Sequence, residues 1–345
     1  EMCIRDSFIG MEEDEMKSFD NVVGHKKIIQ HFEEAIQTGQ ISHAYLLNGE
    51  DGSGKMTLAK AFAKALLCEK HEGCGQCTPC RQADTGNHPD LIYITHEKYE
   101  IRVDEIRQGI NETIDIKPYS SNYKIYIVDD ADRMNVGAQN ALLKTLEEPP
   151  EYAVILLLTN NKDRLLETIL SRCVCMSLGT VPEDQIRDYL KEHTQADEDM
   201  IEFAVSFSLG NLGKAVHVAE TKEFHEMLNE ALGMLGYIHH IELHEMISYL
   251  KTLTKYKEQI YDFLDIMTDW YRDMLILKTT GSVNLLIFKD KYRQLKEQEI
   301  YITFEGLTHI MDEIQKARVR LNANVNFEVT MEMLLLTMKE NGKVW

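Results

Sequence analysis

The segment Gly49–Lys55 limits the folds open to this chain more than any other part of its sequence. It reads Gly-Glu-Asp-Gly-Ser-Gly-Lys and has the G-x-x-x-x-G-K spacing of a phosphate-binding loop. The apolar run Ala44–Leu47 precedes it, and the stretch Lys55–Leu67 after it carries apolar residues at helical spacing. In such a strand, loop and helix, backbone N–H groups and a lysine ammonium surround a phosphate at the helix N-terminus. The predicted phosphate-binding residues are Gly49, Gly52, Gly54 and Lys55.

Short apolar runs alternate with amphipathic stretches through the first half of the chain. This alternation is typical of a parallel sheet flanked by helices. Two of the runs are almost continuously apolar, as expected of strands that are covered on both faces. The predicted strands are Ala44–Leu47, Leu91–Ile94, Lys124–Val128 and Val154–Leu158, of which the last two are the continuous runs.

The strand pattern ends near Pro182, and helical spacing takes over. Residues 182–220 predict a few short helices, and the chain from Phe224 onward is helical in pattern throughout. Apolar stripes at this spacing are typical of core packing. One stripe comprises Leu228, Leu232, Leu235 and Ile238, and another comprises Phe263, Leu264, Met267 and Trp270.

These patterns divide the chain into three domains and a short extension. The first ten residues fit nothing that follows, so we expect an upstream or artefactual extension with the native start at Met11 or Met16; a flexible tail fits equally well. The predicted parts are a disordered or artefactual extension at 1–17, a nucleotide-binding-type α/β domain at 18–178, a small helical lid at 179–222 and an all-helical C-terminal domain at 223–345.

Composition excludes several classes of protein. No apolar run approaches the ~20 residues needed to span a bilayer, which excludes a membrane protein. The N-terminus lacks the apolar region of a secretory signal, so we expect a cytoplasmic location. With 37 basic and 57 acidic residues the formal charge is −20, which disfavours tight, autonomous binding to a phosphate backbone. Any contact with DNA is therefore expected through partners.

The phosphate loop departs from the usual pattern in two ways. Met56 follows the lysine where Ser or Thr normally coordinates Mg²⁺, and the next hydroxyl, Thr57, lies about 100° further around the helix. Glu50 and Asp51 also put two negative charges into a loop meant for phosphate. ATP or ADP binding remains compatible with this loop, whereas efficient hydrolysis is not expected.

A second acidic motif ends the predicted strand Lys124–Val128. Asp129 suits a metal-associated carboxylate, and Asp130 stands where ATP-hydrolysing P-loop proteins of this class carry Glu. A side chain shorter by one methylene leaves the attacking water misplaced, which lowers the rate. The alternative is that both are polar residues that merely end a buried strand.

Four cysteines lie within thirteen residues at Cys68, Cys74, Cys77 and Cys80. Two C-x-x-C steps of this kind predict a tetrahedral zinc site, and four thiolates leave no position open for water, so the site would be structural. His71 and His88 are alternative ligands only if one cysteine drops out, and we expect both to be free surface histidines. Two further cysteines, Cys173 and Cys175, lie in an apolar, strand-like run, and we expect both to be buried thiols.

Several segments closely resemble bacterial clamp-loader subunits of the AAA+ class. The resemblance is strong over about residues 18–220 and looser in the helical C-terminus. It implies an AAA+ P-loop domain with an inserted zinc module at 68–80, followed by a lid and a C-terminal oligomerisation domain. The segments that carry it are Asn140–Pro150, Leu166–Cys173 with its Ser-Arg-Cys motif, Ser42–Leu47 and Val23–His25.

The resemblance also implies roles for three polar residues. Arg172 of the Ser-Arg-Cys motif would reach the nucleotide of a neighbouring subunit, where a guanidinium stabilises developing charge; the alternative is an internal salt bridge. Asn160 corresponds to the first sensor of the γ-phosphate, or else is an ordinary strand-end residue. Lys214 lies in the region of the second sensor, where Arg is usual, or else is a solvated lysine.

Within this family the sequence resembles the delta-prime branch more than the ATP-hydrolysing gamma/tau branch. The altered Met56 and Asp130 and the end of the chain at residue 345 favour delta-prime. So do the segments Gly86–Leu91, Lys117–Tyr119 with Tyr123–Tyr126, and Asp269–Asp273. The resemblance then implies a scaffold of DNA polymerase III that joins gamma/tau and delta subunits in a ring and acts indirectly on the sliding clamp and primer-template DNA. A gamma/tau-type motor is the alternative, and the acidic charge argues against a free-standing zinc-containing nucleic-acid-binding protein.

Overall fold

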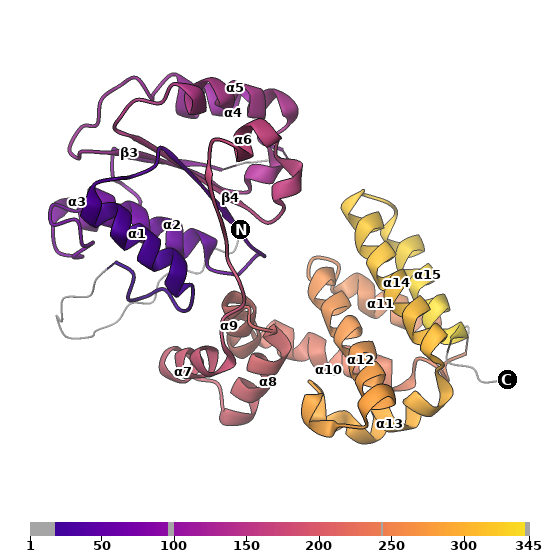
Figure 1. Ribbon diagram of the computed structural model, residues 1–345. Helices are drawn as coiled ribbons and strands as arrows, with labels where there is room; N and C mark the ends of the chain where they lie inside the picture. The colour runs from indigo at the N-terminus through magenta and orange to yellow at the C-terminus, as the bar shows by residue number, and fades with distance from the viewer. Residues whose placement is uncertain (1–17, 96–99, 243, 342–345) are drawn as a thin grey trace. The chain divides into compact units, whose positions relative to one another are not determined.

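The computed structural model describes residues 18–95, 100–242 and 244–341 (Figure 1). The predicted extension at 1–17 lies outside these residues. Two compact units divide the chain: unit 1 runs to Tyr189 and includes Gly210–Gly213, and unit 2 holds Leu190–Leu209 and the chain from Lys214 onward. The predicted lid at 179–222 is shared between the two units, and its boundaries stay a prediction.

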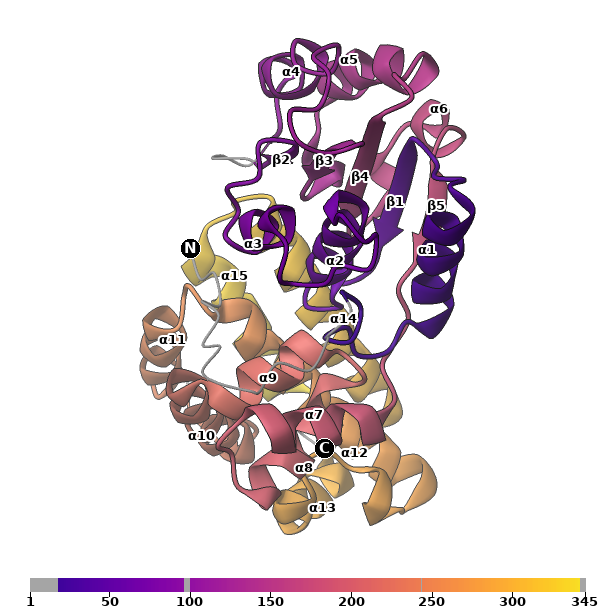
Figure 2. The same ribbon diagram turned by 90° about the vertical axis from the view of Figure 1, so that its left-hand side faces the viewer.

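Unit 1 is built on a five-stranded parallel sheet (Figure 2). The strand order is β2-β3-β4-β1-β5, and every neighbouring pair is parallel. All four predicted strands are confirmed to within one residue at each end. The strands are β1 (Ala44–Asn48), β2 (Leu91–Ile94), β3 (Lys124–Val128), β4 (Ala153–Thr159) and the edge strand β5 (Val174–Ser177).

Helices cover both faces of this sheet (Figure 1). Side chains alternate between the two faces of a strand. Leu47 of β1 accordingly joins the core under α1 and α2, and Leu46 joins the core under α5. Phe32 and Phe62 stack with ring centroids 3.9 Å apart in the first of these cores. The helices are α1 (Lys26–Thr38), α2 (Lys55–Leu67) and α3 (Thr78–Asp84) on one side, α4 (Val103–Ile106), α5 (Val136–Glu147) and α6 (Glu167–Leu170) on the other, and α7 (Glu183–His193) after the sheet.

Asp90 fixes the loop that leads into β3. Its buried carboxylate accepts hydrogen bonds from the backbone N–H groups of Tyr119, Ser120 and Ser121, at 2.6, 2.9 and 3.2 Å. Buried charges in proteins require such partners. The two segments that resemble the delta-prime branch, Gly86–Leu91 and Lys117–Tyr119, are therefore held together by one carboxylate.

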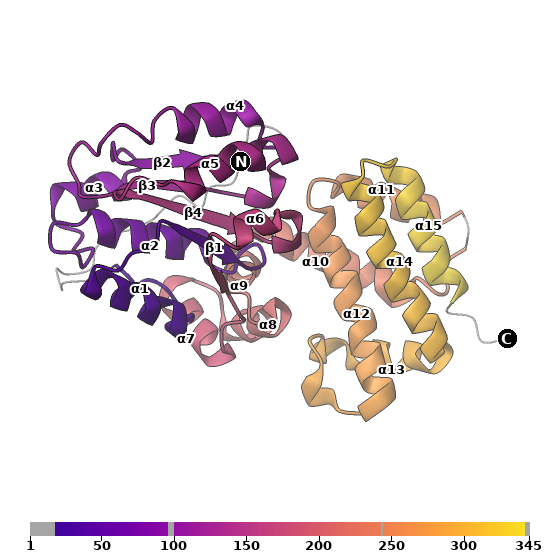
Figure 3. The same cartoon turned by 45° about the horizontal axis from the view of Figure 1, so that its top comes forward.

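Unit 2 is helical over the residues that the structure describes. In Figure 3, α14 and α15 run side by side and α12 lies next to α14. Both predicted apolar stripes are buried, which confirms them as core. No described helix combines the length and apolar character required to cross a membrane. The helices are α8 (Glu198–Ser208), α9 (Leu212–Glu220), α10 (Lys222–Tyr237), α11 (Met246–Lys255), α12 (Ile260–Thr280), α13 (Tyr292–Tyr301), α14 (Phe304–Asn322) and α15 (Phe327–Glu340).

The segment Asp269–Asp273 of α12 is part of the core of unit 2. The indole N–H of Trp270 donates to Gln298 Oε1 at 3.1 Å. The carboxylate of Asp273 accepts from the backbone N–H groups of Ile287 and Phe288 at 2.9 and 2.8 Å. Packing therefore explains why these residue types stand here.

Burial of Asp269 predicts a pH-dependent stability for unit 2. Its side chain is 5% exposed, and one carboxylate oxygen has no hydrogen-bond partner among the described residues. Burial raises the pKa of Asp269 to about 7, although Lys214 opposes the rise. The folded state therefore holds a proton that the unfolded state releases near its ordinary pKa. The contribution of Asp269 to the free energy of unfolding is therefore largest at low pH and is lost as the pH rises through about 7.

We expect Asp269→Asn to stabilise the protein more at pH 8 than at pH 5, because the linkage difference grows between the unfolded pKa of 3.8 and the folded pKa of about 7. The amide is neutral at both values, so the variant avoids the cost of burying a carboxylate charge. Urea unfolding followed by circular dichroism at the two pH values measures this difference. Asp312→Asn, at an exposed position of α14, is the control and should change stability equally at both. Equal effects of Asp269→Asn at the two pH values would contradict the expectation.

Candidate functional site

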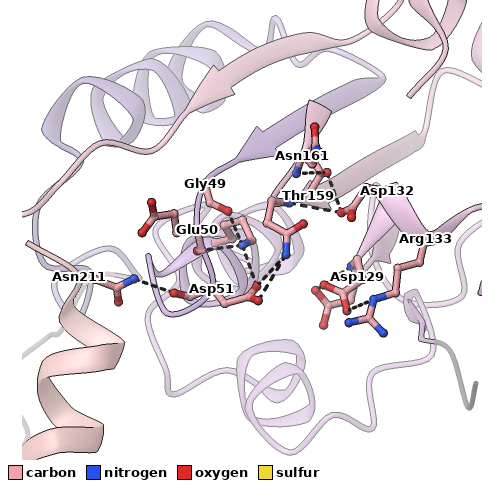
Figure 4. A network of polar contacts seen from close by, with 12 residues as sticks. Gly49, Glu50, Asp51, Asp129, Asp132, Arg133, Thr159, Asn161 and Asn211 are labelled. Atoms are coloured by element: carbon pink, nitrogen blue, oxygen red, sulfur yellow. Dashed lines mark hydrogen bonds and ion pairs between the residues drawn. The ribbon is translucent and has the colours of Figure 1, made fainter. Parts of the chain in front are cut away.

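The phosphate loop connects β1 to α2, as predicted. Its lysine, Lys55, is buried, and its Nζ donates to the carbonyl oxygens of Gly49 and Glu50 at 2.6 and 2.9 Å. The same Nζ lies 3.5 Å from Oδ1 of Asp51 (Figure 4). The backbone at Gly52 and Gly54 has positive φ values of 78° and 91°, which glycine adopts at no steric cost. The ammonium is therefore engaged entirely by groups of its own loop.

Asn160, the predicted first sensor, faces the same loop. Its Nδ2 lies 3.3 Å from both carboxylate oxygens of Asp51. Asp132 holds the end of β4 in place, since its Oδ1 accepts from the hydroxyl of Thr159 at 2.8 Å and from the N–H of Asn160 at 3.3 Å (Figure 4). The parallel sheet thus brings Lys55, Asp51 and Asn160 together.

Residues 210–213 also contact the loop, which the sequence did not predict. Asn211 Nδ2 donates to the carbonyl oxygen of Asp51 at 2.7 Å, and the N–H of Gly213 donates to the carbonyl oxygen of Gly52 at 2.9 Å. A Cβ at Gly213 would lie 2.6 Å from Gly52 Cα, so this approach requires glycine. In the sequence, only the two glycines of the Gly-Asn-Leu-Gly run at 210–213 indicate that another part of the backbone approaches this segment closely.

The acidic pair Asp129 and Asp130 lies at the end of β3. The N–H of Asp130 donates to Asp129 Oδ1 at 3.1 Å, and Arg133 Nε lies 3.2 Å from Asp130 Oδ2. Burial, and then the neighbouring Asp130, raise the pKa of Asp129. Asp130 has a left-handed backbone, with φ of 48°. The structure confirms the strand-end position of both residues, and their part in nucleotide chemistry stays a prediction.

These residues do not fit a magnesium nucleoside triphosphate as they stand. Met56 packs against the core instead of offering a metal ligand, and Thr57 is exposed. Lys55 is bonded to two carbonyl oxygens, and the carboxylate of Asp51 lies where an incoming anion would need to approach that lysine. The chain therefore carries the frame of a phosphate site whose cation is engaged by the chain itself.

Lys214, the predicted second sensor, belongs to unit 2. Its Nζ lies 2.9 Å from Asp265 Oδ2 and 4.3 Å from the centre of the Phe207 ring. Arg318 binds the other oxygen of Asp265 at 2.6 Å. This lysine thus ties α9 to α12, and a role at a nucleotide stays a prediction.

Arg172 follows α6 and makes an ion pair within its own unit. Its Nη2 donates to Glu147 Oε1 at 2.9 Å, and its Nη1 donates to the carbonyl oxygen of Thr168 at 2.8 Å. The side chains of Arg172 and Glu147 are 33% and 51% exposed. The alternative of an internal salt bridge is therefore realised in this chain. Exposed pairs of this kind contribute little free energy, so the pair does not prevent the guanidinium from binding elsewhere.

The four predicted cysteine ligands converge after α2. Their sulfur atoms all lie within 4.8 Å of one another. Gly75, with φ of 69°, makes the turn between Cys74 and Cys77. Burial opposes ionisation of Cys68, yet hydrogen bonds from the backbone N–H groups of nearby residues lower its pKa to about 6. Four thiols, one of them easily ionised, fit a structural Zn²⁺.

The structure also tests the predictions for two histidines and for the two cysteines outside this group. His71 is exposed, as predicted. The prediction that His88 is a free surface histidine is wrong, because this residue is buried and its Nδ1 accepts from the N–H of Asp90 at 3.1 Å. The four-thiol group is complete without either histidine. The prediction that Cys173 and Cys175 are both buried is wrong. Cys175 is exposed, because β5 is an edge strand whose alternate side chains face outward. Cys173, directly before β5, is half-buried.

Known proteins resemble this chain along most of its length. A family described as "DNA polymerase III, delta subunit" matches residues 24–182. DNA polymerase III subunit delta' of Bacillus subtilis is 29% identical, over 91% of this chain and 96% of the relative. DNA polymerase III subunit gamma of Buchnera aphidicola from Acyrthosiphon pisum is 30% identical, over 80% of this chain and 82% of the relative. A gamma subunit-related protein of Thermotoga maritima shares the fold, with a TM-score of 0.51 and 22% identity over 90% of this chain and 99% of that one.

The four-cysteine group predicts a zinc content that single substitutions can test. We expect the wild-type chain and Cys175→Ser to retain stoichiometric zinc, and Cys77→Ser to lose most of it, because a structural site needs all four thiolates. Metal analysis after gel filtration measures the content, and the absorption of the Co²⁺-substituted protein reports tetrahedral thiolate ligation. Equal zinc in Cys77→Ser and the wild type would contradict the assignment.

Proposed function

Because this chain belongs to the family of DNA polymerase III clamp-loader subunits, we propose that it serves in that loader as a delta-prime-type scaffold. In this role it joins gamma/tau and delta subunits in a ring. Through them it takes part in placing the sliding clamp on primer-template DNA. The formal charge of −20 favours an indirect contact with DNA, made through the partners.

The internal engagement of Lys55 is the observation that carries this proposal. A motor subunit needs a lysine free to bind phosphate and a hydroxyl ligand for Mg²⁺. In this chain the lysine is bonded to Gly49 and Glu50, and Met56 stands at the hydroxyl position. Both features support a subunit that contributes structure more than hydrolysis.

Arg172 is the residue that we propose acts on a neighbour. A guanidinium directed at a γ-phosphate stabilises the charge that develops in phosphoryl transfer. Its present partner, Glu147, is half exposed, so exchanging this carboxylate for a phosphate costs little desolvation. A chain with an impaired loop can in this way still support hydrolysis in the assembled ring.

The second candidate is a gamma/tau-type motor that hydrolyses ATP itself. The 30% identity to a gamma subunit and the position of Asn160 beside the phosphate loop favour it. ATP turnover by the purified chain separates the two functions. Brisk turnover that Lys55→Ala abolishes would establish the motor and reject the scaffold.

We expect Arg172→Ala to leave ring assembly nearly normal and to depress DNA-stimulated ATP hydrolysis of the reconstituted loader. Loss of an arginine of this kind slows hydrolysis at the site that it completes by on the order of 10³-fold. Total turnover of the loader should therefore fall by the fraction that this one site contributes. Arg172→Lys should restore little, since an ammonium lacks the planar fork. Gel filtration and steady-state turnover measure the two effects.

Arg164→Ala is the matched control, because it removes an exposed arginine from the same segment. The loader reconstituted with Arg164→Ala should assemble and hydrolyse ATP like the wild-type loader. Normal hydrolysis by the Arg172→Ala complex would reject the role in trans.

A further inference from the structure

The carboxylate of Asp51 occupies a central position in the phosphate loop. One of its oxygens lies 3.5 Å from the ammonium of Lys55, and both lie 3.3 Å from the amide nitrogen of Asn160. These are the cation of the loop and the residue predicted to sense a terminal phosphate. A carboxylate resembles a phosphate in presenting anionic oxygen acceptors to such donors.

We propose that Asp51 is an internal competitor for nucleotide, a side chain that sets the affinity of this loop by engaging the donors a bound phosphate requires. The inference goes beyond the role in trans, because it concerns the loop of this chain alone. It also separates Asp51 from the altered Met56, which affects the metal and not the phosphate donors.

The backbone at Asp51 is held in a way that favours this contact. Asn211 donates to the carbonyl oxygen of Asp51 (Figure 4). The N–H of Gly213 donates to the carbonyl oxygen of Gly52, so consecutive peptide groups are anchored from residues 210–213. A side chain whose backbone is already fixed loses less conformational entropy when it binds. The contact to Lys55 therefore needs only the torsions of one short side chain.

The exposure of Asp51 determines how strong the competition is. Its side chain is 80% exposed, so a nucleotide can displace the carboxylate toward solvent. The displaced charge remains near the phosphates and repels them, and this repulsion adds to the contacts that are lost. Asp51 should consequently weaken nucleotide binding without blocking it.

Glu50 supplies a matched control. It carries the same charge at the adjacent position of the loop and is exposed, and only its backbone carbonyl oxygen contacts Lys55. Glu50→Gln therefore removes an equal charge while leaving the contacts of the Asp51 carboxylate intact. A difference between the two neutral variants isolates the contact from the general electrostatic field.

The test is calorimetric titration of the full-length chain with the slowly hydrolysed analogue ATPγS in the presence of Mg²⁺. We expect Asp51→Asn to bind about tenfold more tightly than the wild type, and Glu50→Gln to gain about twofold or less. Adding Lys55→Ala to Asp51→Asn should abolish the gain, which places the nucleotide at the loop. Circular dichroism and zinc content verify that each variant is folded.

Equal gains in the two neutral variants, or no gain in either, would overturn the inference. Tight binding of ATPγS by the wild type would overturn it as well. The measurement uses the isolated chain, whereas the role of Arg172 is tested in the assembled ring, so failure of one can be told from failure of the other.

Discussion

The parallel pairing of β1 with β4 is the interaction on which the site of unit 1 depends. Asn48 lies opposite Thr159 in this register, so the chain that leaves β1 into the phosphate loop lies next to the chain that leaves β4 at Asn160. Parallel strands end at one edge of a sheet, and α/β proteins form their sites there. The continuous apolar sequences of β3 and β4 bury that sheet on both faces and hold the edge rigid. Polar residues can therefore gather at this edge while the apolar strands behind it stay covered by helices on both faces.

Charge balance explains how the cations of such a site come to be occupied. The chain has 57 acidic and 37 basic residues, so a lysine or arginine readily finds a carboxylate. The ion pairs found at the predicted site residues are Lys55 with Asp51, Arg172 with Glu147, and Lys214 with Asp265. Such pairs contribute little stability where they are exposed, but they replace the anions that a working nucleotide site would supply. A chain with this charge balance can thus keep the strand, loop and helix of a phosphate site while its cations pair with its own carboxylates.

The sequence predicted what depends on local pattern and missed what depends on tertiary contact. Strands β1 to β4 follow from short apolar runs, and the cysteine group follows from its spacing. The contacts of Asp51 join residues 109 and 160 positions apart, and no local pattern encodes them. Cys175 was misjudged because an edge strand can be as apolar in composition as a central one. The segment Asp269–Asp273 marked a family branch by resemblance, and its buried contacts show that packing constrains it.

Helix α2 connects the two chemical features of unit 1. It begins at Lys55 in the phosphate loop and ends at Leu67, directly before Cys68 of the four-cysteine group. Lys64, near its C-terminus, pairs with Asp84 of α3 at 2.7 Å, which adds a second connection at the end that carries the cysteines. In a nucleotide-dependent protein the phosphate would order the N-terminus of this helix. Here the first residue of the helix, Lys55, is bonded through its side chain to the carbonyl oxygens of Gly49 and Glu50, and the last residue leads directly into the four-cysteine group.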